Sequence, residues 1–407
     1  MPLLHHAAWV LPIAGPPIRN GLVAVDHGKI VDVGQESLPG PRPFDGAQGG
    51  PQAPGPCCAI LPGLINAHAH LELSWMRGQV PPAQSMPAWV ERLMALRLAA
   101  GEDAPAPITA AIAEMRASGT AAVGDITNSL AAWVPLAASA LSAVVFLELL
   151  GFNVTDPENL VSSAAERLAA LTPVALLRSA IVPHAPYSVS PALLRAIARF
   201  PQEGPISVHV GESPDEMELL RSGRGGWRQL LEKFGVWAAD WIPPACGPVE
   251  FLSRAGLLSE RLLAVHCVQL TNEELARLAE AGATVVTCPR SNEWVGVGAP
   301  PVERFYAAGV RVAIGTDSLA SVEDLNMFNE IAAVRALAPG VPASRILKSA
   351  TLDGATALGF RRELGSIEPG KRAELIAVDV PADVADVEEY LVSGRVQPSD
   401  LRWLEAY

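Results

Sequence analysis

The stretch Leu64-Ile65-Asn66-Ala67-His68-Ala69-His70-Leu71-Glu72 contains the pattern that decides how the rest of the chain is interpreted. The apolar residues 60–65 that lead into it predict a short buried strand. Successive side chains of a strand alternate between its two faces, so His68 and His70 lie on the same side. Two neutral imidazoles at one strand end can supply two nitrogen ligands to a divalent metal ion. Such a pair is common by chance, so the rest of the chain has to complete the site.

Composition limits the class of protein. Half of the 407 residues are hydrophobic, which allows a large core, and no long uninterrupted apolar run predicts a membrane span. The N-terminus has no basic segment followed by an apolar one, so we expect no secretory signal. A net charge of -13 argues against nucleic acid or an anionic membrane as partner. The five cysteines lack the spacing of a disulfide framework, so we expect a reduced, cytoplasmic protein.

The two ends of the chain have β character. Residues 21–26 and 29–34 are short β runs joined by His27-Gly28, which predicts a hairpin. Residues 35–59 are rich in Gly and Pro without periodicity, which predicts a loop or a poorly ordered insertion. Another strand is predicted at 373–379. We therefore expect 1–61 and 361–407 to form one small β-sandwich domain around a catalytic barrel of residues 62–360.

In the middle of the chain, apolar β runs alternate with stretches of helical periodicity. The predicted strands after the first are 120–125, 143–148, 174–182, 206–209, 262–266, 284–287 and 310–315. Helices are predicted at 87–99, 108–117, 157–171, 322–337 and 343–358, with further helix starts at Ser190-Pro191 and Thr271-Asn272-Glu273-Glu274. This alternation favours a (β/α)8 TIM-type barrel. A doubly wound open sheet is the alternative, but no glycine-rich turn follows the first strand.

Histidines gather at the predicted strand ends, where a barrel carries its active site. Beyond the first strand these are His184, His209 and His266. His209 would complete three nitrogen ligands with His68 and His70. Glu212, three residues further on, could approach a metal-bound water without being a ligand; the alternative is an ordinary surface glutamate.

Two further groups complete the predicted constellation. His266 ends the sixth strand and is expected beside the metal, although a histidine satisfied by the backbone would look the same, and Cys267 is taken as structural. Asp317 ends the eighth strand and would face the first strand of a closed barrel; otherwise it is a turn or capping residue. Barrels with two metals usually bridge them with a modified lysine, and none of the four lysines ends a barrel strand. We therefore expect one metal ion, which would lower the pKa of a bound water.

These motifs together resemble the amidohydrolase superfamily, in its deaminase and chlorohydrolase branch. The resemblance covers nearly the whole chain, including the segment 350–359. It implies that His68, His70, His209 and Asp317 hold one divalent ion, either zinc or iron. It also implies that Asp317 accepts a proton from water, that Glu212 passes a proton to the substrate ring nitrogen, and that His266 stabilises the attacking water.

Details inside this resemblance indicate a substrate. The segment 70–78 departs from the His-Leu-Pro-Met pattern of S-adenosylhomocysteine deaminases and looks more like aminodeoxyfutalosine deaminases, as do 248–252 and 287–292. The preferred expectation is deamination of 6-amino-6-deoxyfutalosine, a nucleoside of menaquinone biosynthesis via futalosine. Alternatives are adenosine, S-adenosylhomocysteine, methylthioadenosine or guanine deamination, a triazine-type chlorohydrolase, and a barrel that binds without catalysis.

Four residues are expected to contact the substrate. The resemblance places His184 against sugar or base, unless it is a structural histidine. Arg290 could meet an acidic substituent such as the benzoate of aminodeoxyfutalosine, or form a rim salt bridge. Glu72 could hold ribose hydroxyls or orient a ligating histidine, and Asn292 belongs to the same motif as Arg290. Family members are often dimers, so the resemblance also implies a homodimer.

Overall fold

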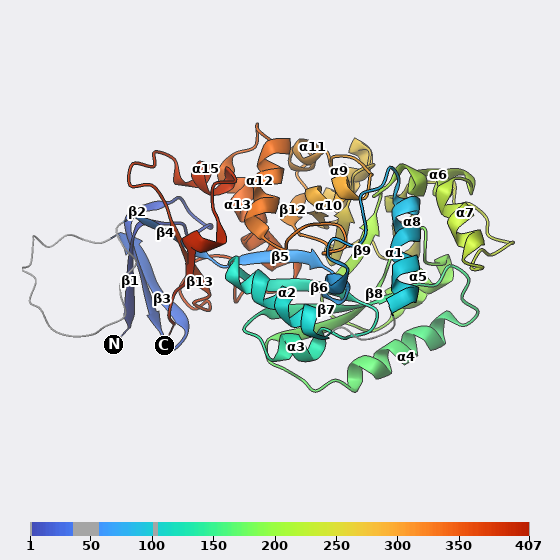
Figure 1. The fold of residues 1–407 in the computed structure, drawn as a ribbon, viewed down its shortest axis with the longest axis horizontal. Coiled ribbons are helices and arrows are strands. Elements are labelled where there is room, and N and C mark those ends of the chain that lie inside the picture. The colour runs from blue at the N-terminus through green and yellow to red at the C-terminus, as the bar shows by residue number, and fades with distance from the viewer. Residues whose placement is uncertain (1, 36–56, 101–104, 407) are drawn as a thin grey trace, which may run out of the picture.

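The computed structural model describes residues 2–35, 57–100 and 105–406. The predicted loop at 35–59 lies mostly outside these residues, but its last two residues already belong to a strand. Figure 1 shows a sheet at one end of the molecule, where both chain termini lie, and a larger body of helices and strands beside it. None of the helices in the described residues is both long and apolar enough to cross a membrane.

The sheet at the chain ends has six strands in the order β14-β13-β4-β1-β2-β3. Their bounds are β1 Leu3–Val10, β2 Ile18–Asp26, β3 Lys29–Gln35, β4 Cys58–Pro62, β13 Leu375–Asp379 and β14 Leu401–Trp403. The predicted hairpin is confirmed, because β2 and β3 pair antiparallel across His27 and Gly28. Both turn residues have positive φ, 48° and 73°, as the tight hairpin turn requires.

Segments from both ends of the chain share this sheet, since β4 pairs with β1 on one side and with β13 on the other. The described strands of these segments form one sheet, so the predicted sandwich of two sheets is not confirmed. The division of the chain at residues 61 and 361 stays a prediction.

The strand predicted at 60–65 is wrong in one respect, because the chain changes sheets at Gly63. β4 ends at Pro62 in the terminal sheet, and β5 (Leu64–Ala69) begins the parallel strands. A side chain at Gly63 would lie 2.6 Å from Cβ of Ala121 and 2.8 Å from the ring of Trp403, so only glycine allows this close approach. Both strands are buried on both faces, so their residues read as one apolar run.

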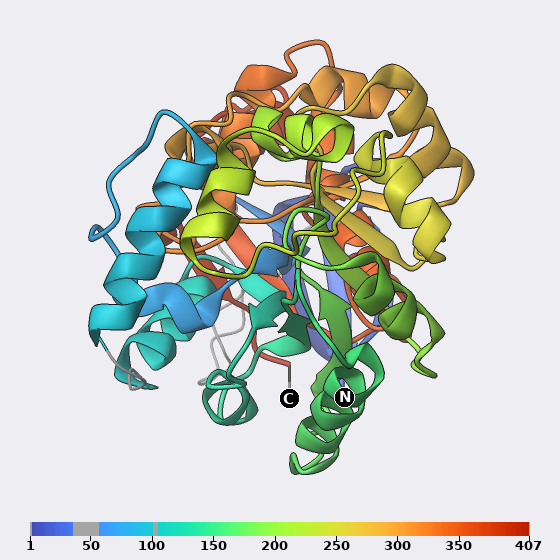
Figure 2. The ribbon, with the colours of Figure 1, turned by 90° about the vertical axis from the view of Figure 1, so that its right-hand side faces the viewer.

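In the larger body, the described residues form eight parallel strands in two sheets of four. One sheet has the order β5-β6-β7-β8 and the other β9-β10-β11-β12. The two sheets meet at an isolated bridge between Ala69 and Asp317, and at a hydrogen bond from the His209 amide to the His184 carbonyl, 2.9 Å. Helices surround these strands in Figure 2, which fits a TIM-type barrel, although the pairing between the described strands is not continuous around it. The remaining strand bounds are β6 Thr120–Thr127, β7 Ser142–Leu149, β8 Leu177–Pro183, β9 Ile206–Val210, β10 Leu262–His266, β11 Thr284–Thr287 and β12 Arg311–Ile314.

Helices follow most strands, and the predicted caps are present. The Ser190 hydroxyl accepts a hydrogen bond from the Leu193 amide, and Thr271 with Glu274 forms the predicted capping box. The helix bounds are α1 Met86–Ala100, α2 Pro105–Ala117, α3 Trp133–Ala137, α4 Pro157–Ala169, α5 Pro191–Arg199, α6 Pro214–Ser222, α7 Gly226–Lys233, α8 Pro248–Ala255, α9 Asn272–Glu280, α10 Pro289–Trp294, α11 Val302–Ala307, α12 Met327–Leu337, α13 Ala343–Ser349, α14 Leu352–Ala357 and α15 Val387–Val392, with 3-10 turns at Leu71–Met76 and Pro398–Asp400.

Two helix predictions need correction. The helix predicted from 322 begins at Met327, because the Asn326 side chain caps it by accepting a hydrogen bond from the Phe328 amide. The helix predicted at 343–358 is two helices, α13 and α14, because Thr351 leaves helical geometry with φ -133° and ψ -92°.

A core substitution tests how far the parallel strands depend on packing. Phe146 on β7 is fully buried, so Phe146→Ala should cost about 3–5 kcal/mol of stability through lost burial and an unfilled cavity. Urea unfolding measures this. Val134→Ala, at a side chain that is 74% exposed, is the control and should stay within about 0.5 kcal/mol of the parent. Equal effects of the two changes would contradict this packing.

Candidate active site

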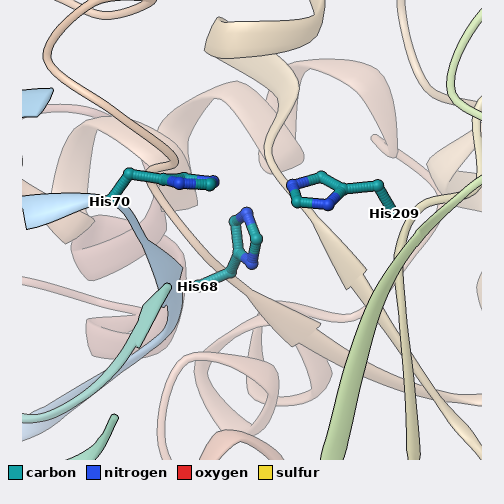
Figure 3. Close-up of side chains that lie close together, drawn as sticks. All are labelled: His68, His70 and His209. Atoms are coloured by element: carbon teal, nitrogen blue, oxygen red, sulfur yellow. The ribbon is translucent and has the colours of Figure 1, made fainter. Parts of the chain in front are cut away.

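Three predicted histidines converge where β5 and β9 end. The side chains of His68, His70 and His209 each offer a ring nitrogen, and these atoms all lie within 4.8 Å of one another. The rings point toward one another from two different strands in Figure 3. The ring of His68 is 5.0 Å from that of His70 and 4.9 Å from that of His209, centroid to centroid. The structure therefore brings the three imidazoles together.

Asp317 lies on the same cluster. Its Oδ1 is 3.5 Å from Nε2 of His70 and 4.0 Å from Nε2 of His68. The Ser291 hydroxyl donates to its Oδ2 at 2.6 Å, and its amide donates to the His68 carbonyl at 3.0 Å. This carboxylate thus faces the first barrel strand, as the sequence predicted.

The donor set fits a divalent metal ion. Both ring nitrogens of His68 are buried and lack a hydrogen-bond partner. Nδ1 of His209 is 3.0 Å from the His184 carbonyl, which leaves its Nε2 for a metal. Burial lowers the pKa of His68 well below its usual value, and it lowers the pKa of both His70 and His209 to about 4. The imidazoles are therefore neutral at pH 7, which is the form that binds metals.

Glu212 and His266 form a buried pair beside this cluster. Nε2 of His266 is 3.5 Å from Oε1 of Glu212, and Nδ1 of His266 contacts the Asn292 amide nitrogen at 3.0 Å. Burial raises the pKa of Glu212 well above its usual range and lowers that of His266 well below it. A carboxyl group that stays protonated at neutral pH can serve as an acid toward a bound molecule.

The backbone is strained where the reactive side chains leave their strands. His266 and Cys267 have φ values of 71° and 54°, and Asp317 has 63°. Residues other than glycine rarely adopt this region, and such strain concentrates at functional sites. Cys267 itself is fully buried, and its structural role stays a prediction.

Two carboxyl groups near the site were missed from the sequence. Glu216 accepts hydrogen bonds from the amides of Gly211 and Glu212, 2.9 and 3.0 Å, and so holds the turn that carries Glu212. Glu148 is the next-to-last residue of β7, with its Oε1 3.6 Å from Nδ1 of His209. Burial raises the pKa of both glutamates to about 8. Their strand-end and helix-turn positions were the available signals.

A cavity of about 470 Å³ opens beside the cluster, within the range typical of small-molecule sites. Its polar lining includes His70, Glu72, Glu148, His184, His209, Glu212, His266 and Asp317. Much of the rest is apolar and comes from α1, α7 and the residues that follow α7. The cavity therefore combines a reactive polar end with an apolar wall.

His184 and Glu72 both line this cavity, but their contacts differ. Nδ1 of His184 is bonded to the Ser188 hydroxyl at 2.5 Å, so its Nε2 remains for other contacts. Oε2 of Glu72 accepts hydrogen bonds from Thr127, Asn128 and Ser129, 2.7–3.1 Å away. Burial alone would raise the pKa of Glu72, but these bonds and Arg97 hold it below its usual value. Oε2 is thus fully used within the protein, whereas Oε1 has the single 3.3 Å contact with Arg97, and the predicted ribose contact of Glu72 stays a prediction.

Neither Arg290 nor Asn292 is among the residues that line the cavity, so their substrate contacts gain no support from it and stay predictions. The Arg290 guanidinium binds both oxygens of Asp324, at 2.9 and 3.0 Å, and lies 3.4 Å from Glu330. Its charge is therefore satisfied inside the protein, as in the alternative salt-bridge interpretation. Asn292 instead contacts His266. Both residues lie on α10, and Arg290 fixes the helix whose Asn292 orients His266.

Histidines that could hold a metal ion at the strand ends of a TIM-type fold are typical of metal-dependent enzymes. The model of the amidohydrolase family matches residues 59–398, so this chain belongs to that family. It is 31% identical to a 5-methylthioadenosine/S-adenosylhomocysteine deaminase of Moorella thermoacetica, over 95% of this chain and 92% of the relative. It is 34% identical to an aminodeoxyfutalosine deaminase of Deinococcus radiodurans, over 74% of each.

The solved structures that match this chain include deaminases as well. Aminofutalosine deaminase of Helicobacter pylori, in complex with methylthio-coformycin, matches with a TM-score of 0.83 and 25% identity, covering 99% of this chain and 97% of that one. An adenosine deaminase from Xanthomonas campestris with bound zinc has a TM-score of 0.78 and 28% identity, covering 97% and 90%. That zinc and the histidine cluster support a divalent metal ion in this chain.

Metal analysis tests the ligand set. His209→Ala and Asp317→Ala should each weaken metal binding by more than about 10-fold, the loss that even outer partners of a ligand can cause. Chelation should abolish activity, and Zn²⁺ or Fe²⁺ should restore it. His184→Ala, whose ring is 4.8 Å from that of His209, is the control and should keep the metal. Metal loss only in the control would contradict this ligand set.

The role of Arg290 can be tested through stability. Burial raises the pKa of Glu330 to about 8, so above this pH Arg290→Met leaves a buried charge without its cation, which should cost about 3 kcal/mol. The double variant R290M/E330M removes both charges and should be less destabilised in urea unfolding. An Arg290→Met protein of unchanged stability, with a raised KM for its substrate, would instead restore the predicted substrate contact.

Proposed function

We propose that this chain catalyses the metal-dependent hydrolytic deamination of an adenine-type nucleoside. The observation that carries the proposal is the pair Glu212 and His266, buried beside the imidazole cluster. Oε2 of Glu212 and Nε2 of His266 have no hydrogen-bond partner within the described structure. Buried polar atoms rarely stay unpaired, so these atoms are available to a substrate and a water molecule. The names of the relatives support the same reaction.

The chemistry follows from the position of each side chain. His68, His70, His209 and Asp317 would hold one divalent ion, zinc or iron, which lowers the pKa of water and so supplies a nucleophile at neutral pH. Asp317 accepts a proton from the attacking water, and His266 stabilises the water oxygen by a hydrogen bond. The oxygen attacks the ring carbon that carries the amine.

Glu212 completes the reaction. It gives its proton to the ring nitrogen next to the attacked carbon, which its raised pKa allows at neutral pH. The carbon–nitrogen bond to the amine then breaks, and ammonia leaves with the proton that Asp317 took from water, while the remaining hydroxyl proton returns to Glu212. The product carries a carbonyl in place of the amine.

The preferred substrate is 6-amino-6-deoxyfutalosine, which would place the enzyme in menaquinone biosynthesis. The aminodeoxyfutalosine deaminase of D. radiodurans and the aminofutalosine deaminase of H. pylori support this choice. The second candidates are 5-methylthioadenosine and S-adenosylhomocysteine, which the M. thermoacetica relative favours over nearly the full chain, and adenosine, which the X. campestris structure favours. Guanine and triazine hydrolysis have less support, since the matching triazine hydrolases, at 20% identity, show the fold alone. A homodimer stays a prediction.

Replacing the proposed acid tests the mechanism. Glu212→Gln should lower kcat by about 10²–10⁴-fold while the metal content stays unchanged, because Glu212 moves a proton but is not a ligand. The assay is ammonia release across a panel of adenine nucleosides that includes 6-amino-6-deoxyfutalosine. Glu218→Gln, at an exposed position on helix α6, which follows Glu212 in the chain, is the matched control and should behave as the parent. Full activity of Glu212→Gln would refute this role.

A further inference from the structure

The cavity wall formed by α1 changes character along the helix. Met86, Trp89, Val90, Leu93 and Met94 line the cavity at helical spacing, and the next residue on this face is Arg97. Arg97 is the one lysine or arginine among the described residues that line the cavity. A ligand that lies along α1 therefore meets apolar side chains first and a fixed positive charge at the end.

Arg97 keeps hydrogen-bonding capacity that Arg290 has lost. Its two contacts are single and long, 3.3 Å from Nη2 to Glu72 and 3.4 Å from Nη1 to Asn128. A guanidinium has five N–H donors, so most remain available. Its side chain is 38% exposed, within reach of a ligand in the cavity. The charge of Glu72 is meanwhile largely met by the loop at 127–129.

Contacts of Arg97 connect it to His209 through two other side chains of the cavity. Asn128, which Arg97 contacts, donates to Oε2 of Glu148 at 3.2 Å, and Glu148 lies 3.6 Å from His209. Two side chains therefore separate the guanidinium from the imidazole cluster. A group bound by Arg97 would therefore lie beside Glu72 and Asn128 rather than on the ring nitrogens of the cluster.

We propose that Arg97 binds a carboxylate at the end of an apolar substituent on the nucleoside sugar, while that substituent packs along α1 and α7. This assignment rests on the proposed deamination of an adenine-type nucleoside. If the assignment holds, the enzyme prefers nucleosides whose sugar carries an aryl carboxylate substituent over nucleosides with a short uncharged substituent. Arg97 thereby takes the role that sequence reasoning gave to Arg290.

Paired substrates test this assignment. Arg97→Met keeps an apolar side chain but removes the charge, so KM for 6-amino-6-deoxyfutalosine should rise about 10- to 100-fold, as for a lost charged hydrogen bond, with little change in kcat. KM for its carboxylate methyl ester and for 5-methylthioadenosine should change less than about 3-fold. Arg97→Lys should lie between Arg97→Met and the parent for the carboxylate substrate.

Two controls separate substrate binding from structural effects. Arg92→Met, on an exposed residue of the same helix, should leave all three KM values unchanged. Glu72→Gln removes the protein's own partner of Arg97 and should not raise KM for the carboxylate substrate selectively. An equal rise of KM for charged and uncharged substrates in Arg97→Met would overturn the assignment, as would a parent enzyme that accepts 5-methylthioadenosine but not 6-amino-6-deoxyfutalosine. If the parent deaminates no adenine nucleoside at all, the proposed function itself fails.

Discussion

Burial of titratable side chains at the ends of the barrel strands is the constraint on which the site depends. Imidazoles and carboxyl groups removed from water lose the solvation that would stabilise their charged forms. His68 therefore stays neutral and ready to bind a metal, while Glu212 stays protonated and ready to donate. The fold tolerates this cost because the neighbours of these groups are fixed: Ser291 holds Asp317, and Asn292 holds His266.

The sequence allowed the reactive end of the site to be predicted, because each of its residues sits at a strand end that local patterns reveal. Period-2 alternation placed His68 and His70 on one side, and apolar runs located the strands that carry His209, His266 and Asp317. The caps of α5 and α9 were also predictable, since they depend on residues three positions apart.

Features that depend on distant partners were not predictable. Arg290 looked available to a substrate, but Asp324 and Glu330 come from a segment more than 30 residues away and satisfy its charge. The sheet change at Gly63 depends on Ala121 and Trp403, which one-dimensional periodicity does not contain. The apolar wall was likewise hidden, because its two helices meet only in the fold.

The seam between the two four-stranded sheets has a consequence for the whole molecule. His68 and His70 come from the first sheet, whereas His209 and Asp317 come from the second sheet or the turn that leaves it. An ion bound by all four side chains would connect the two sheets at a place where few backbone hydrogen bonds join them. Because the ion would bind the folded chain, its binding free energy adds to the free energy of unfolding. The ion would then stabilise the fold as well as take part in the reaction. The metal-bound protein would resist heat and proteases better than the metal-free protein.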